Sequence, residues 1–134
     1  MKQLSVFIEN REGRLFDVLR ILGENDINII SLSLADTNDY GMLRMIVSKP
    51  QVALSILRDC GLSATLTQIL AIKLPHESGS LGRALAAIND AGINIEYMYG
   101  LCADGDEAVL AIKTSDVAQA AKLLKRAGIE QWQM

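Results

Sequence analysis

Two short polar turns hold the side chains of this sequence that are best suited to bind a small molecule. The first reads Glu9-Asn10-Arg11-Glu12-Gly13 and the second Pro75-His76-Glu77-Ser78-Gly79-Ser80-Leu81. In each, a polar residue follows a strand-like alternation, and a glycine three residues later leads into a helix-like pattern. Free N–H groups at the start of a helix attract a carboxylate, and glycine lets a ligand approach the backbone. The turns therefore predict carboxylate-binding sites, with a plain turn capped by Asn10 or Ser78 as the alternative.

A second signal is an asparagine between two isoleucines. It occurs as Ile27-Asn28-Ile29 and again as Ile93-Asn94-Ile95, each at the expected start of a strand. Asparagine is disfavoured in strands, so the same residue at the same place in two segments indicates a requirement. That requirement is either a local backbone hydrogen bond or a ligand contact. We therefore count these asparagines, with Ile29 and Ile95, among the candidate ligand-binding residues.

Residues for catalysis are scarce. His76 is the only histidine, and no Gly-x-Ser-x-Gly motif is present for a nucleophilic serine. One histidine and two distant cysteines do not make a zinc site, and no Gly-x-x-x-x-Gly-Lys-Ser/Thr loop is present for nucleotide phosphates. Asp104 and Asp106 lie in a predicted hairpin turn, where solvated carboxylates are common. We therefore predict a protein that is not an enzyme and that uses no metal and no cofactor.

The cysteines and two of the tyrosines are expected to be structural. Cys60 is predicted to lie on the apolar stripe of a helix as a small buried side chain, and Cys102 near a polar turn, without a disulfide between them. Tyr97 and Tyr99 have no counterpart in the first half of the chain. They are expected to share a strand face with Ile95 and to fill core or interface space.

The composition favours a folded protein. Of the 134 residues, 50% are hydrophobic, which disfavours a disordered chain. The net charge of −3 is spread along the chain and only 4% of residues are aromatic, which argues against a nucleic-acid-binding surface. No apolar run is long enough to cross a bilayer, and the N-terminus lacks the apolar core of a signal peptide. A cytoplasmic protein that binds neither nucleic acid nor membrane is therefore expected.

The sequence contains an internal repeat. A shift of 66 residues places Gly13 on Gly79 and superimposes the two Ile-Asn-Ile segments without a gap. Later the shift becomes 67, which places Gly61 on Gly128. Two hydrophobic frameworks with the same spacing indicate two copies of one small unit. The predicted domains are residues 1–67 and 68–134.

Each copy has the pattern of a β-α-β-β-α-β unit. Apolar residues alternate first, as in a half-buried strand: Leu4, Val6 and Ile8, then Leu70, Ile72 and Leu74. They next recur at helical spacing: Leu15, Val18, Leu19 and Leu22, then Leu81, Ala84, Leu85 and Ile88. Two β-rich runs follow in each copy, at 27–35 with 42–48 and at 93–101 with 108–114. The second helix is expected to begin at Pro50, or after Ser115 as N-cap, and to end at Gly61 or Gly128. This order predicts an α+β fold of two ferredoxin-like units, each with both helices on one face of an antiparallel sheet.

These residues resemble a known family, the ACT domain. The resemblance rests on Ile8 to Leu15 with Asp26-Ile27-Asn28-Ile29, and in the second copy on Gly79, Leu81 and Gly92-Ile93-Asn94-Ile95. The resemblance is especially to the small regulatory subunit of acetolactate synthase and to the regulatory domain of phosphoglycerate dehydrogenase. It departs from the family at Glu12, where proline is usual, and at Ile8, where serine-binding relatives carry histidine. His76 also replaces the residue type found at Asn10.

The resemblance implies two ACT units paired side by side, with a free L-amino acid bound at the interface between the repeats. It implies a freestanding regulatory or sensor protein that forms a homodimer or a higher oligomer and acts on a biosynthetic enzyme. Within one copy, the first two strands run parallel, so the glycine turn and the asparagine lie at opposite ends of the sheet. We therefore expect composite sites, in which the Asn10 turn works with Asn94 and the His76 turn with Asn28.

Three other functions remain open on the sequence. The protein could be an obligate regulatory subunit of an acetolactate synthase-like enzyme. It could be a small acylphosphatase-like enzyme, which needs an arginine-bearing phosphate loop after the first strand; Arg11 is near, but the second copy has Glu77 there. An RNA-binding ferredoxin-like module is disfavoured because its strands would need exposed aromatic residues.

Overall fold

The chain folds into two compact units. The structure, a computed structural model, describes residues 1–36 and 39–133. One unit spans Lys2–Thr67, and the other begins at Gln68 and includes Met1. Each unit has the order β-α-β-β-α-β, so the prediction of two ferredoxin-like α+β units is confirmed.

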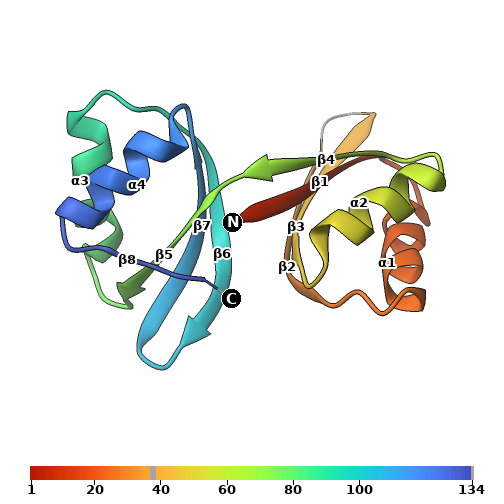
Figure 1. Ribbon diagram of the computed structural model, residues 1–134, viewed down its shortest axis with the longest axis horizontal. Helices are drawn as coiled ribbons and strands as arrows, with labels where there is room; N and C mark the ends of the chain where they lie inside the picture. Colours follow the sequence, from red (N-terminus) through yellow and green to blue (C-terminus); the bar gives the residue numbers. More distant parts are fainter. Residues whose placement is uncertain (37–38, 134) are drawn as a thin grey trace. The chain divides into compact units, whose positions relative to one another are not determined.

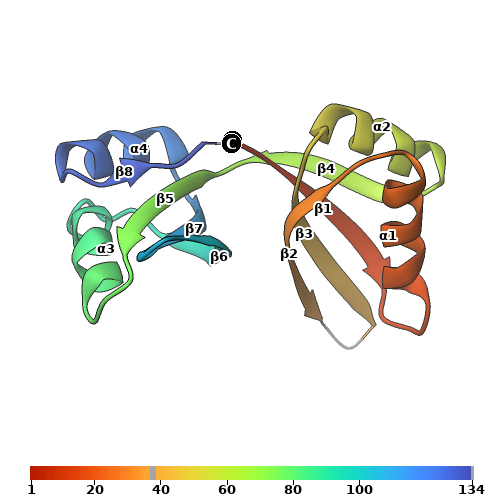
Figure 2. The same ribbon diagram turned by 90° about the horizontal axis from the view of Figure 1, so that it is seen from below.

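The N-terminal unit is built on a four-stranded antiparallel sheet in the order β2-β3-β1-β4. Glu9 pairs with Tyr40 and Leu4 with Met45, so β1 and β3 run antiparallel. Both helices cover one face of this sheet (Figures 1 and 2). The elements are β1 (Lys2–Glu9), α1 (Arg14–Glu24), β2 (Ile29–Asp36), β3 (Tyr40–Val47), α2 (Pro50–Asp59) and β4 (Ser63–Gln68).

The C-terminal unit repeats this architecture, with the strand order β6-β7-β5-β8. Its two helices likewise cover one face of the sheet (Figure 1). The last strand, β8 (Glu130–Gln131), is much shorter than its counterpart β4. The other elements are β5 (Leu70–Pro75), α3 (Ser80–Asp90), β6 (Ile95–Asp104), β7 (Glu107–Thr114) and α4 (Val117–Arg126).

Each unit has its own hydrophobic core between the sheet and the two helices. The alternating residues of the first strands are buried as predicted, because every second side chain points to the helix-covered face. One position of the predicted helical stripe is wrong: Leu81 is 36% exposed, and Ser80 takes the inward position at the start of α3. The buried cores contain Leu4, Val6, Val18, Leu22, Leu43, Met45 and Leu57 in one unit and Ile72, Leu74, Ala84, Ile88, Ile112, Ala120 and Leu124 in the other.

The one-residue slip of the repeat lies in a β-bulge of β6. The register between β6 and β7 shifts between Gly100 and Cys102, and no such shift occurs at the matching place in β2. Leu101 is therefore an extra residue in the strand. An earlier shift, between Ile95 and Tyr97, reverses the alternation of side chains. It contradicts the expected common face of Tyr97 and Ile95, because Tyr97 pairs with Lys113 and not with a core residue.

The second helices follow the sequence signals with one correction. Pro50 begins α2 as predicted, and Gly61 and Gly128 follow α2 and α4 with φ of 82° and 81°. The N-cap of α4 is Asp116, not Ser115, because the Asp116 carboxylate accepts a hydrogen bond from the Gln119 N–H at 3.0 Å.

The expected burial of Cys60 is wrong. The residue lies one position past the end of α2, and both Cys60 and Cys102 are exposed free thiols. Among the residues that the structure describes, none of the helices is long and apolar enough to cross a membrane.

Two glycines of the first helix allow a matched test of backbone strain. Gly13 precedes α1 with φ of 83°, whereas Gly23 lies inside it, and an added Cβ would meet nothing within 4 Å at either position. We expect Gly13→Ala to lower the free energy of unfolding by about 1–2 kcal/mol, because L side chains avoid this backbone region. Gly23→Ala should raise it by roughly 0.5–1 kcal/mol. Urea unfolding measures both, and a Gly13→Ala protein as stable as the parent would contradict the strained geometry.

Candidate functional site

The two candidate turns have the same backbone structure. In the first, the Asn10 N–H donates to the carbonyl of Asp39 at 2.9 Å; in the second, the His76 N–H donates to the carbonyl of Asp106 at 2.9 Å. Each turn is thus tied to the loop between the next two strands of its own unit. The following bonds also match, since Asp17 donates to Gly13 at 2.9 Å and Arg83 to Gly79 at 3.0 Å.

A left-handed glycine ends each turn and occupies the N-cap position. Gly13 has φ of 83° and Gly79 of 84°, and neither helix has a side-chain cap. The alternative in which Asn10 or Ser78 serves as the N-cap is therefore wrong. A glycine N-cap has no side chain to bond the N–H groups of the first turn. The Arg14 and Ser80 N–H groups donate to the Arg11 and Glu77 carbonyls at 3.4 and 3.3 Å, so it is the N–H groups after them that can take an acceptor from outside.

The side chains of the turns are mostly solvent-exposed. Arg11 forms an ion pair with Glu9 at 3.0 Å, and in the second turn Arg83 pairs with Glu77 at 3.3 Å. A Cβ built on Gly79 would lie 2.7 Å from the Arg83 Nη1, so this guanidinium lies against the glycine. The remaining predicted residues of the turns divide by burial: Asn10, Glu12, His76, Ser78 and Leu81 are exposed, and Ser80 is buried.

The repeated asparagines make the same local contact in both units. The Asn28 N–H donates to Ser48 Oγ at 3.0 Å, and the Asn28 carbonyl accepts from the Ser48 N–H at 2.9 Å. Asn94 and Ser115 repeat this exchange at 3.2 and 2.9 Å. These bonds use the asparagine backbone. Within the described residues the asparagine side chains are exposed and form no hydrogen bond.

The glycine turn and the asparagine of one unit lie at opposite ends of its sheet, as predicted. Glu9, before the turn, pairs with Tyr40 at one end of β3, and Ile29, after the asparagine, pairs with Val47 at the other. A strand of this length spans roughly 20–25 Å. One small ligand cannot contact both. Ile95 begins β6 at the place that matches Ile29, and both isoleucines are partly buried.

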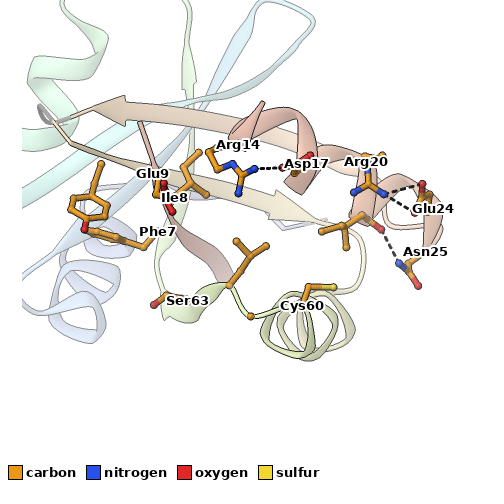
Figure 3. Close-up of a pocket in the computed structure, with 14 residues that line it drawn as sticks. Phe7, Ile8, Glu9, Arg14, Asp17, Arg20, Glu24, Asn25, Cys60 and Ser63 are labelled. Atoms are coloured by element: carbon orange, nitrogen blue, oxygen red, sulfur yellow. Dashed lines mark hydrogen bonds and ion pairs between the residues drawn. The ribbon is translucent and has the colours of Figure 1, made fainter. Parts of the chain in front are cut away.

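A groove of about 770 Å³ lies beside the first turn of the N-terminal unit. It runs along α1 and is closed by the end of β1 and the segment after α2 (Figure 3). The turn residues Asn10 to Gly13 do not line it, but Glu9 and Arg14 on either side of them do. Phe7 and Tyr40 stand at one end with ring centroids 5.2 Å apart.

Alternating charges line the helix side of this groove, and sequence reasoning missed them. Arg14 pairs with Asp17 at 3.1 Å, and Arg20 pairs with Glu24 at 3.3 Å (Figure 3). The Arg14 Nε is buried and has no hydrogen-bond partner. A comparison of the two copies could have revealed these charges, because the second copy has serine, arginine, alanine and aspartate at the four matching positions. The charged groove is therefore specific to the N-terminal unit.

The family of the chain follows from its two units and from a family profile. The profile of the ACT domain pair matches residues 1–131. The chain belongs to this family. The resemblance seen in Ile8 to Leu15 and in the two Ile-Asn-Ile segments is thereby confirmed.

Solved structures agree with this assignment. Protein BT0572 from Bacteroides thetaiotaomicron is 34% identical, with a TM-score of 0.92 over 98% of this chain and 90% of that one. The ligand-free regulatory subunit of aspartate kinase from Thermus thermophilus is 18% identical, with a TM-score of 0.67 over 94% and 91%. The corresponding subunit from Thermus flavus is 20% identical, with a TM-score of 0.64 over 95% and 92%. The two aspartate kinase subunits share the fold of this ACT domain pair. No curated protein matches the chain.

Substitutions of Ser48 and of Asn28 distinguish a structural role of the Asn28–Ser48 contact from a role of the Asn28 side chain in ligand binding. We expect Ser48→Ala to lower the free energy of unfolding by roughly 0.5–1.5 kcal/mol, because the Asn28 N–H loses its acceptor. Asn28→Ala should change it by less than about 0.5 kcal/mol, because the exposed amide contributes no bond to the fold. Urea unfolding of both variants is the measurement. A cost for Asn28→Ala as large as that for Ser48→Ala would mean that the amide is structural.

Proposed function

We propose that this ACT domain pair is a regulatory protein that senses a free L-amino acid. The observation that supports it best is the turn before each first helix, which is built twice with the same backbone hydrogen bonds and the same left-handed glycine. Gly13 and Gly79 leave the N–H groups at the start of α1 and α3 without a side-chain cap. An uncapped helix start suits a carboxylate, which every free amino acid carries.

Charged side chains near each turn suit the other end of an amino acid. Glu9 begins the first turn and Glu77 lies within the second, and each forms an ion pair with an arginine. A carboxylate near the helix start can accept the ligand ammonium, while the arginine that releases it turns to the ligand carboxylate. The two turns carry different side chains, so we propose that they bind with different affinities.

The second candidate is a regulatory subunit that binds a separate biosynthetic enzyme. It is favoured by the fold, since chains of similar length that share it include the regulatory subunits of aspartate kinase named above. The resemblance to the acetolactate synthase small subunit points the same way. Affinity purification from the source cell distinguishes the candidates, because an obligate subunit brings down its catalytic partner in a fixed ratio.

An acylphosphatase-like enzyme is disfavoured because the arginine that it would need for phosphate binding is already paired with a carboxylate. Arg11 is paired with Glu9 at 3.0 Å, and a phosphate would have to displace that carboxylate. The second turn carries Glu77 at the matching position. We therefore propose a cytoplasmic, non-catalytic sensor.

A melting-temperature screen against the common L-amino acids tests the proposal. A ligand at about a hundred times its dissociation constant stabilises the folded state by roughly 2.7 kcal/mol, which corresponds to a rise of several degrees. We expect at least one L-amino acid at about 10 mM to produce this rise and its D-enantiomer to produce a smaller one. A flat response across the whole set would remove the basis for the sensor.

A double-mutant cycle tests whether one repeat's turn works with the other repeat's asparagine. Since Asn10 and Asn28 belong to opposite ends of one sheet, their alanine substitutions should be additive in ligand binding. Asn10→Ala and Asn94→Ala should instead couple by more than about 0.5 kcal/mol if the sites are composite. Calorimetric titration of the four variants with the ligand from the screen gives both numbers, and the opposite pattern would rule out composite sites.

A further inference from the structure

The N-terminal unit leaves an apolar edge uncovered. β2 is an outer strand of its sheet, and Leu32 and Leu34 pair with Met45 and Leu43 of β3. Residues directly opposite each other in an antiparallel pair lie on the same face, so both leucines lie on the helix-covered side. They are nevertheless 43% and 45% exposed. The helices therefore do not reach far enough to cover the β2 edge.

Phe16 extends this edge onto α1, with 67% of its side chain exposed. Arg14 and Ile21 line the groove on the flank of α1 that faces the segment after α2 (Figure 3). At about 100° per residue, Phe16 projects from the opposite flank. Figure 2 shows α2 toward β4 and α1 toward β2, so this flank faces the β2 edge. Phe16, Leu32 and Leu34 together are named the N-terminal edge.

The matching edge of the C-terminal unit is recessed. The shift of 66 residues places Gly82 of α3 on Phe16 and Gly100 of β6 on Leu34, and these two glycines are named the C-terminal edge. Both are exposed, and a Cβ built on either would meet nothing within 4 Å. Gly82 also has no left-handed φ. Neither the backbone nor the packing of this unit therefore requires a glycine inside α3, where glycine is a poor helix former.

The difference in size decides which edges fit together. Two units that meet edge to edge with their helices on the same side are related by a two-fold or pseudo-two-fold axis, which brings matching positions near the axis together. Two N-terminal edges would bring two copies of Phe16 into one place, and two C-terminal edges would leave a gap between glycines. One edge of each kind fills the space, because Phe16 meets Gly82. Close-packed contacts favour this combination.

The connection between the units reserves this contact for a second copy of the chain. β4, at the edge of its sheet opposite β2, joins β5 through the single residue Ile69. Three strand spacings separate β4 from β2 and two separate β5 from β6, so edges of one chain that lay side by side would hold β4 and β5 roughly 30 Å apart. A single intervening residue spans only about 7 Å.

We propose that the N-terminal edge of one copy docks on the C-terminal edge of a second copy, so that two such contacts close a symmetric dimer. The second strands then run antiparallel, which brings the second copy's Asn94 to the end of β2 that lies beside the Asn10–Gly13 turn. The composite sites of the proposed function form between copies in this arrangement. The dimer itself does not depend on the sensor function.

Exchanging the large and the small residue tests the inference by analytical ultracentrifugation of the full chain. The parent protein should be a dimer at about 10 μM. Phe16→Ala removes the projecting ring, and Gly82→Phe fills the recess that receives it, so each should raise the dimer dissociation constant at least about tenfold. The double variant places the ring on the other side of the same contact. It should return the constant to within about threefold of the parent.

Val52→Ala is the control, since Val52 is a 49% exposed apolar residue on α2, away from the β2 edge. It should change the constant by less than about twofold. A parent protein that is monomeric at about 100 μM would overturn the inference. So would a double variant as weak as the single ones. If only Phe16→Ala weakens the dimer, two N-terminal edges meet and the proposed combination is wrong. None of these results bears on the amino-acid screen, so the sensor function is tested separately.

Discussion

One constraint sets the rest of each unit: the chain must leave a central strand, turn back within four residues and start a helix that covers the same sheet. The glycines at 13 and 79 meet it with φ of 83° and 84°, which an L side chain rarely adopts. Since glycine then stands at the N-cap, no side chain satisfies the first N–H groups of the helix. The geometry that closes the fold therefore also leaves an acceptor-seeking surface at the same end of each sheet.

The two units share their backbone structure but differ in the side chains next to the turns. Backbone bonds at the turns and at Asn28 and Asn94 agree within 0.2 Å or less between matching pairs. The side chains next to them do not agree. The first repeat has paired charges along α1 and a leucine packed over β3, whereas the second has small residues along α3 and a glycine in β6. A duplicated fold can change its two sites separately, because each unit has its own core.

The sequence predicted those parts that depend on local periodicity. Strand alternation such as Leu4 to Ile8, the helical stripes and the start of α2 at Pro50 all follow from the chain's own pattern, and the repeat doubled each signal. Sequence reasoning failed where pairing with a neighbouring strand determines the side-chain direction. The bulge at Ile95 is set by pairing with β7, so the side on which Tyr97 lies was not readable from alternation. Ser115 was predicted as the N-cap of α4, but its hydroxyl instead accepts a hydrogen bond from the Asn94 N–H.

The second bulge in β6 lay outside sequence reasoning for a similar reason. Gly100 looks like an ordinary weak point of a strand, and only its pairing with Leu110 shows that it lies where the register with β7 shifts. A glycine inside a strand costs roughly 0.5–1 kcal/mol relative to alanine. Close packing does not demand it here, because the space where a side chain would begin is open. Left-handed backbone does not demand it either. A glycine inside a strand often marks a bulge, and Gly100 stands directly before the extra residue Leu101.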